Sequence, residues 1–145
     1  MGTVHILLVE DNEGDILLTQ EAMEAATMLV KISVVNDGQE AIEFLTRQNG
    51  FAKVQVPDLI LLDINLPRKN GHEVLKFIKG DTGLKQIPVI MLTTSSSEKE
   101  INLAYQNYVN CYITKPVEVN EFISIVKTIE NFWISVAKLP KTKNY

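Results

Sequence analysis

The stretch PDLILLDINLP, residues 57–67, contains four consecutive apolar residues, Leu59–Leu62, and the apolar run stops at Asp63. A strand with one face in water alternates apolar and polar residues. An unbroken apolar run therefore predicts a strand that is buried on both faces. Such strands occur in parallel sheets that are covered by helices on both sides.

The same pattern recurs along the chain, because short apolar segments alternate with longer segments of helical spacing. The expected strands are residues 4–10, 30–37, 57–63, 87–94 and 109–115. The expected helices are residues 13–26, 37–48, 71–80, 97–107 and 117–138. This alternation predicts an α/β fold: a doubly wound, five-stranded parallel sheet with five helices on its two faces.

Composition narrows the class of protein. With 145 residues, 46% of them apolar and 22% charged, the chain is expected to form one globular domain. A net charge of −4 argues against non-specific binding of nucleic acid. The sequence lacks a signal peptide and any apolar segment of the ~18 residues needed to cross a membrane. Cys111 is the single cysteine, which suits a reducing cytoplasm. We expect a cytoplasmic domain over residues 1–138 and a short tail, 139–145.

Polar residues stand where the expected strands end: Glu10 and Asp11 at the end of the first, Asp63 at the end of the third, Thr93 in the fourth and Lys115 in the fifth. In open α/β sheets ligands bind beyond the carboxyl ends of the strands, so these side chains are expected to meet. Three neighbouring carboxylates repel one another unless a cation neutralises them, and their oxygens suit Mg²⁺. The pattern predicts a site that holds a phosphoryl group on a carboxylate, between a metal ion and a lysine.

The segments LLVEDN, PDLILLDINLP, VIMLTT and YITKPV resemble the signature segments of the receiver domain of two-component response regulators. The resemblance runs from about residue 4 to residue 136, and the separations of Asp63 from Thr93 and Lys115 match the family's register without a gap. It implies the flavodoxin-like receiver fold. The loop RQNGFAKVQVPD and the C-terminal segment are most similar to the small stand-alone response regulators that accompany cyanobacterial phytochromes.

The resemblance implies a role for each residue of the site. Asp63 would be the phosphoacceptor, Lys115 would bind the phosphoryl group, and Thr93 would serve both in the chemistry and as the switch hydroxyl. Tyr112 would be the switch aromatic residue. The peptide bond between Lys115 and Pro116 is expected to be cis, as in the family, which would aim the ammonium group into the site.

By the same resemblance, the cofactor would be Mg²⁺, held by Glu10, Asp11, Asp63 and the backbone carbonyl of Asn65. The phosphoryl donor would be a sensor histidine kinase, with a phytochrome as the candidate. The chain would not be an enzyme beyond its own phosphorylation and slow autodephosphorylation. Because it ends at Tyr145, output is expected through contact with a downstream protein or further phosphorelay, without nucleic acid or membrane.

Two local expectations concern the second half of the chain. Asn107 precedes Tyr108 where many receivers have glycine, and we expect Asn107 to take the left-handed conformation there. Adjacent helical residues lie ~100° apart, so Phe132 and Trp133 cannot both face the core. One of them, with Ile123 or Ile134, should be exposed.

An exposed aromatic side chain on the last helix favours a homodimer, formed through the fourth helix, the fifth strand and the fifth helix with Phe132 and Trp133. The alternative is an amphipathic stripe that simply wraps the end of the domain.

Two alternative functions remain open at this stage. The first is a magnesium-dependent phosphohydrolase with an aspartyl-phosphate intermediate. Such enzymes use a second aspartate two residues after the nucleophile as general acid, and this chain has Asn65 there. The second is a receiver-like binding module that signals without phosphorylation, against which the complete set of strand-end residues argues. Turnover of small phosphate esters and an Asp63→Asn variant distinguish these alternatives from a phosphoacceptor.

Overall fold

The computed structural model describes residues 3–24 and 30–140. Residues 1–2 and 25–29 of the expected domain, which include the end of the first expected helix, and residues 141–145 of the expected tail lie outside these ranges. The elements are β1 (Val4–Val9), α1 (Glu13–Glu24), β2 (Val30–Val35), α2 (Gly38–Leu45), β3 (Leu59–Leu62), α3 (Gly71–Gly80), β4 (Val89–Thr93), α4 (Glu98–Gln106), β5 (Cys111–Thr114), α5 (Val119–Ile129) and the π-helical segment η1 (Glu130–Val136). No helix in the described ranges is both long and apolar enough to cross a membrane.

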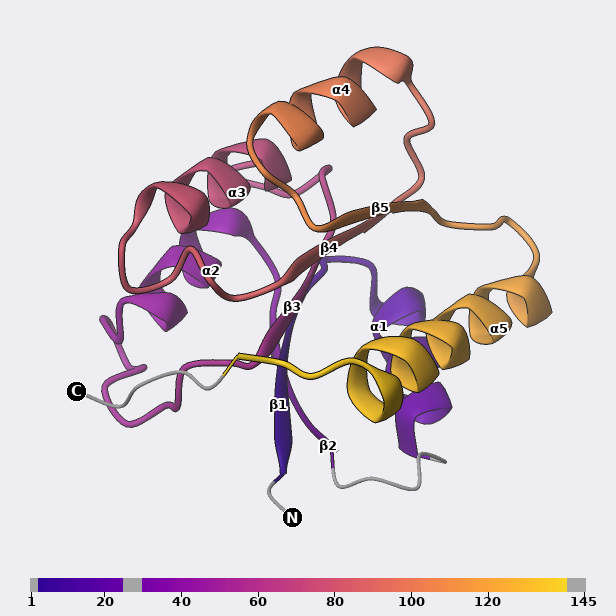
Figure 1. Cartoon of the computed structure of the whole chain (residues 1–145), viewed down its shortest axis with the longest axis horizontal. Coiled ribbons are helices and arrows are strands. Elements are labelled where there is room, and N and C mark those ends of the chain that lie inside the picture. The colour runs from indigo at the N-terminus through magenta and orange to yellow at the C-terminus, as the bar shows by residue number, and fades with distance from the viewer. Residues whose placement is uncertain (1–2, 25–29, 141–145) are drawn as a thin grey trace.

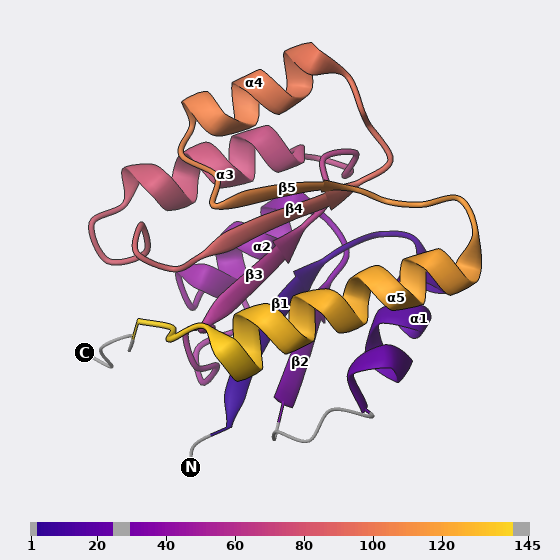
Figure 2. The ribbon, with the colours of Figure 1, turned by 45° about the vertical axis from the view of Figure 1, so that its right-hand side comes forward.

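The described strands form one sheet in the order β2-β1-β3-β4-β5, and every neighbouring pair is parallel. Helices cover both faces, with α1 and α5 on one side and α2, α3 and α4 on the other (Figures 1 and 2). The predicted doubly wound fold is therefore confirmed. Its order places β1, β3 and β4 at the centre, and leaves β5 at an edge of the sheet.

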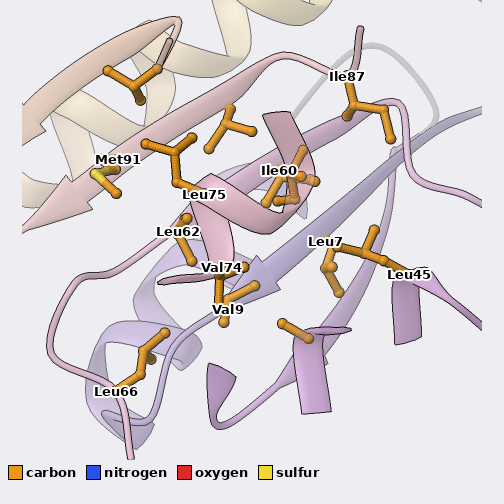
Figure 3. Close-up of a cluster of buried hydrophobic side chains, with 14 of the residues drawn as sticks. Leu7, Val9, Leu45, Ile60, Leu62, Leu66, Val74, Leu75, Ile87 and Met91 are labelled. Carbon is orange, nitrogen blue, oxygen red and sulfur yellow. The ribbon is translucent and has the colours of Figure 1, made fainter. Parts of the chain in front are cut away.

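The apolar run in β3 is buried on both faces, as its composition predicts. Ile60 and Leu62 enter one core cluster with the side chains of α2 and α3 (Figure 3), whereas Leu59 and Leu61 enter a second cluster with α1 and α5. All four side chains are fully inaccessible to solvent. Burial of each side chain of this size stabilises the folded state by about 1.5–3 kcal/mol. The strand β3 therefore contributes to both core clusters, one on each face of the sheet.

Each of three helices that begin near the carboxyl edge has a polar residue at its start that fixes its first turn. The side chain of Asn12 accepts a hydrogen bond from the Asp15 amide at 2.9 Å, and that of Ser97 from the Glu100 amide. Asn70 forms a reciprocal pair of bonds with Glu73 at the start of α3. These caps satisfy amide groups that a helix leaves unpaired, and they hold the loops around the site.

The left-handed residue after α4 is Tyr108 (φ 66°), so the expectation for Asn107 is wrong. Asn107 has a φ of −96° and still donates its amide to the last turn of α4. The Val109 amide then bonds the Ala104 carbonyl and the Tyr108 amide bonds the Tyr105 carbonyl, which is the Schellman arrangement. Burial of Val109 beside Ala104 explains why the reversal comes one residue later than expected.

The final helix is not one regular α-helix, because the expected segment 117–138 changes to π-helical geometry at Glu130. The Ala137 amide bonds the Phe132 carbonyl, five residues back. This wider turn buries both Ile129 and Ile134, which an α-helix would place 140° apart around its axis. Ile134 was one of two residues expected to be exposed, and the wide turn is the reason that it is not.

The exposed aromatic residue of the final helix is Phe132, with 52% of its surface accessible. Trp133 is partly buried and packs against the core cluster under α5, as does Ile123. The expectation that only one of the two aromatic residues faces the core is therefore confirmed. On α1, Leu17 is also exposed (55%).

Candidate functional site

The predicted strand-end residues meet at the carboxyl edge of the sheet. Asp63 directly follows β3, Thr93 ends β4, and Lys115 directly follows β5. The backbone amide of Lys115 donates a hydrogen bond to the Thr93 carbonyl at 2.6 Å. All three side chains are buried, with at most 7% of each residue accessible. They come together because parallel strands end at the same edge, which is the ligand-binding edge of this class of fold.

The Lys115 ammonium group is bound by three carboxylates. Its Nζ donates to Glu10 Oε1 at 2.5 Å, to Asp15 Oδ2 at 3.0 Å and to Asp63 Oδ2 at 3.1 Å. Burial disfavours the charged form, but the bond to Glu10 and the charges of Asp63 and Glu10 outweigh it and raise the pKa of Lys115. Lys115 is thus a fixed, permanently charged cation beside Asp63.

Glu10, Asp11 and Asp63 form an acidic cluster in which one oxygen of each lies within 4.8 Å of the others. Burial and the charge of Asp63 raise the pKa of Glu10 to about 7, although the bond to Lys115 opposes the shift. The single charge of Lys115 is shared among three carboxylates, so it does not neutralise all of them. A hard divalent cation with oxygen ligands would complete the charge balance, and the donor set fits Mg²⁺.

Thr93 has a fully buried hydroxyl group that has no hydrogen-bond partner among the described residues. An unpaired buried hydroxyl is costly, and it marks a position where a further polar group is accommodated. Tyr112 of β5 is paired with Met91 of the neighbouring strand β4. Its hydroxyl group donates a hydrogen bond to the Ser95 carbonyl at 2.8 Å. The loop that follows Thr93 is thus held by β5.

Two expectations about the site need separate comment. Asn65 is exposed, and the role that the resemblance implies for its backbone carbonyl stays a prediction. The expected cis peptide bond at Pro116 is absent: the described residues contain no cis peptide. Lys115 nevertheless reaches Asp63, because its backbone is bonded to the end of β4 and its long side chain extends along the carboxyl edge.

Asp15 is a member of the site that sequence reasoning missed. It lies in the first turn of α1 and not at a strand end, so the strand pattern does not point to it. Its position four residues after Asp11, just after the Asn12 cap, was the available signal. Gly71 also supports the site, because a side-chain carbon there would collide with the backbone of Asp63 and Ile64.

The chain belongs to the response regulator receiver domain family, whose pattern it matches over residues 6–127. It is 42% identical to the response regulator Rcp1 of Synechocystis sp., in an alignment that covers 93% of this chain and 92% of Rcp1. Receiver domains are signalling modules, and no catalytic activity on other substrates is named for these relatives.

Two solved structures are closely similar. The phosphorylated cyanobacterial phytochrome response regulator RcpA superposes with a TM-score of 0.94 at 48% identity, covering 97% of this chain and 100% of RcpA. The Mn²⁺-bound form of Rcp1 superposes with a TM-score of 0.93 at 41% identity, covering 95% and 99% of the two chains. This chain therefore has the flavodoxin-like receiver fold and is related to the response regulators of phytochromes.

Proposed function

We propose that the chain is a phosphorylation-dependent signalling protein of the cytoplasm, with residues 1–138 as its receiver domain and Asp63 as its phosphoacceptor. A histidine kinase supplies the phosphoryl group. One carboxylate oxygen of Asp63 forms a bond to phosphorus while the bond between phosphorus and the donor's imidazole nitrogen breaks. The product is an aspartyl phosphate, and the kinase histidine keeps the electron pair of the broken bond.

The observation that carries this proposal is the arrangement of two groups around Asp63. The Lys115 ammonium group lies 3.1 Å from its carboxylate, and the buried Thr93 hydroxyl at the neighbouring strand end has no partner. A fixed cation offsets charge on the phosphoryl oxygens, and a hydroxyl can donate to them. A phosphoryl group on Asp63 would use both the ammonium group and the hydroxyl group to stabilise its oxygens.

Mg²⁺ would be held by carboxylate oxygens of Glu10, Asp11 and Asp63 and by the Asn65 carbonyl. When bound, it would neutralise charge on the phosphoryl oxygens. The close approach of the Glu10, Asp11 and Asp63 carboxylates supports this assignment. The similarity to a receiver whose structure contains Mn²⁺ supports a divalent ion in the same role.

The signal would leave the site through Thr93 and Tyr112. A phosphoryl group on Asp63 attracts the Thr93 hydroxyl, and the loop after β4 moves with it. That loop carries the Ser95 carbonyl to which Tyr112 is bonded, so the Tyr112 ring must find a new position. Phosphorylation would thereby shift the population between two arrangements of the face formed by α4 and β5.

The test is treatment with acetyl phosphate and Mg²⁺, followed by intact mass. Wild type should gain one acid-stable, base-labile phosphoryl group, and Asp63→Asn should gain none. Asp81→Asn, a matched carboxylate change at the far end of α3, should behave as wild type. If wild type gains nothing, the chain is a binding module. Turnover of small phosphate esters would instead indicate a phosphohydrolase, which the exposed Asn65 amide in place of an acid disfavours.

A phytochrome is the proposed kinase partner, because several solved structures similar to this chain are response regulators of phytochromes and bacteriophytochromes. Exposed apolar side chains near the site fit a docking kinase: Leu17 lies two residues beyond Asp15, and Val117 two residues beyond Lys115. Phosphotransfer from an autophosphorylated phytochrome should exceed that from an unrelated histidine kinase. Leu17→Asp should slow this transfer and leave phosphorylation by acetyl phosphate unchanged.

We also propose that the chain forms a homodimer through α4, β5 and the final helix. β5 is an edge strand, and beside it lies an open apolar hollow of about 280 Å³. Its lining includes Cys111, Ile113, Phe132 and Trp133, and Val136, in the same π-helical segment as Phe132, is exposed (61%). An apolar surface centred on an aromatic pair suits a self-complementary two-fold interface.

Light scattering after size-exclusion chromatography tests this assembly. Val136→Asp should give a monomer, whereas Leu17→Asp should keep the dimer. Phosphotransfer gives the reciprocal result, since Leu17→Asp should impair docking of the kinase and Val136→Asp should not. If wild type is a monomer both with and without beryllofluoride, the apolar hollow only closes the end of the domain. The same measurement shows whether the dimer depends on phosphorylation.

A further inference from the structure

The Lys115 ammonium group has no unused hydrogen-bond donor. An ammonium group offers three N–H donors, and in this structure each is directed to a different carboxylate: Glu10, Asp15 and Asp63. Only one of these partners is the proposed phosphoacceptor. The other two determine the direction in which the third N–H points.

Glu10 can provide only part of that support. One of its oxygens binds Lys115, and the other accepts the amides of Asp11 and Asn12 at 3.2 and 3.1 Å. Glu10 also belongs to the acidic cluster that would hold a divalent cation. A cation bound there would compete with Lys115 for the Glu10 carboxylate. Asp15 would then be the carboxylate that keeps the Lys115 ammonium group in position.

Asp15 is suited to be that partner because it lies outside the acidic cluster and its backbone is fixed on both sides. Its amide donates to the Asn12 cap at 2.9 Å, and its carbonyl accepts the buried Thr19 hydroxyl at 2.7 Å. Its side chain is 26% accessible and approaches Lys115 from the α1 side of the site. Among the described residues, no other helical side chain forms a hydrogen bond or ion pair with this ammonium group.

We propose that Asp15 is a positioning residue that anchors Lys115, so that one ammonium N–H stays directed at Asp63. The inference deepens the proposed phosphoacceptor function and rests on it. A fixed cation stabilises charge on the phosphoryl group both when the group is gained and when it is lost. Loss of the anchor should therefore slow both reactions. Simple removal of a negative charge would instead speed the gain from an anionic donor, so the direction of the effect is diagnostic.

The experiment compares Asp15→Asn with Glu13→Gln, which removes the same charge from the same turn of α1 at an exposed position. With acetyl phosphate and saturating Mg²⁺, Asp15→Asn should gain the phosphoryl group about threefold to tenfold more slowly, and should lose it more slowly after the donor is removed. Glu13→Gln should match wild type. In a Lys115→Met background, Asp15→Asn should have no further effect, because it acts through the lysine.

A second readout does not need phosphorylation. In protein labelled with ¹⁵N-lysine, the buried Lys115 ammonium signal, assigned by its loss in Lys115→Met, should shift or broaden in Asp15→Asn and remain unchanged in Glu13→Gln. The proposal is overturned if this signal is unchanged, if Asp15→Asn reacts as fast as wild type or faster, or if its effect persists without Lys115. If wild type takes no phosphoryl group at all, the proposed function fails, and the spectrum alone judges the positioning role.

Discussion

The hydroxyl group of Tyr112 donates a 2.8 Å hydrogen bond to the backbone carbonyl of Ser95, and this single bond connects the edge strand β5 to the loop after β4. Tyr112→Phe removes the bond and keeps the ring. We expect the free energy of unfolding to fall by about 0.5–1.5 kcal/mol, the usual net value of such a bond. Urea unfolding measures it, and an unchanged midpoint would mean that water replaces the hydroxyl without loss.

Thr93→Val should stabilise the unphosphorylated protein. The substitution replaces a buried hydroxyl that lacks a partner among the described residues with a methyl group of similar size. Removing an unpaired buried polar group should raise the free energy of unfolding by about 1 kcal/mol. The same variant should lose any change of assembly with beryllofluoride. Thr114→Val, at the paired but exposed position on β5, is the control and should stay within about 0.5 kcal/mol of wild type. A destabilised Thr93→Val would show that its hydroxyl is already satisfied.

Gly71→Ala should destabilise the protein by about 1–3 kcal/mol or more, because the added carbon would collide with the backbone of Asp63 and Ile64. The displaced carboxylate should also accept a phosphoryl group more slowly. Gly80→Ala provides the matched control at the other end of α3, where the added carbon meets nothing within 4 Å. There alanine should stabilise the helix by up to about 1 kcal/mol. Equal thermal shifts for the two variants would refute the steric argument.

Stability should fall on acidification because of His5. Burial, reinforced by the charge of Lys31, lowers the pKa of His5 below its ordinary value of 6.5, despite the opposing charge of Asp58. Between the folded and unfolded pKa values the unfolded chain binds more protons, so stability rises with pH in that window. The contribution of His5 to stability is fully present above about pH 6.5, the unfolded pKa, and is lost as the pH falls through the lowered pKa of the folded state. His5→Gln should flatten this part of the stability curve measured by urea unfolding. An unchanged slope would assign the acid sensitivity to other groups.

The strand-end residues of the site were predictable because parallel strands finish at one edge of the sheet. A polar residue after each apolar run therefore indicates convergence before any contact is known, and the geometry brings Asp63, Thr93 and Lys115 together. Asp15 was not predictable by this reasoning, since it belongs to a helix. Its contact with Lys115 depends on where the first turn of α1 lies relative to the residue that follows β5.

Local backbone choices were predicted less well, because they depend on packing that a pattern does not contain. Asn107 has the better intrinsic preference for a left-handed conformation, yet Tyr108 adopts it so that Val109 can be buried. Likewise, the spacing of Phe122, Val126 and Ile129 fits an α-helix and extends to Trp133. Nothing in that series indicates where the turn widens.

The π-helical segment η1 has a consequence for chain length. Ile129 and Ile134 face the same core from positions five residues apart. In an α-helix that role falls to residues three or four apart. The segment is thus equivalent to an α-helix that has accepted one inserted residue on its solvent side. Deleting Asn131 should restore regular α-helical geometry and keep both isoleucines buried. It would change which residues between the two isoleucines face outward, so the length of this segment, as well as its composition, determines which side chains face a neighbouring molecule.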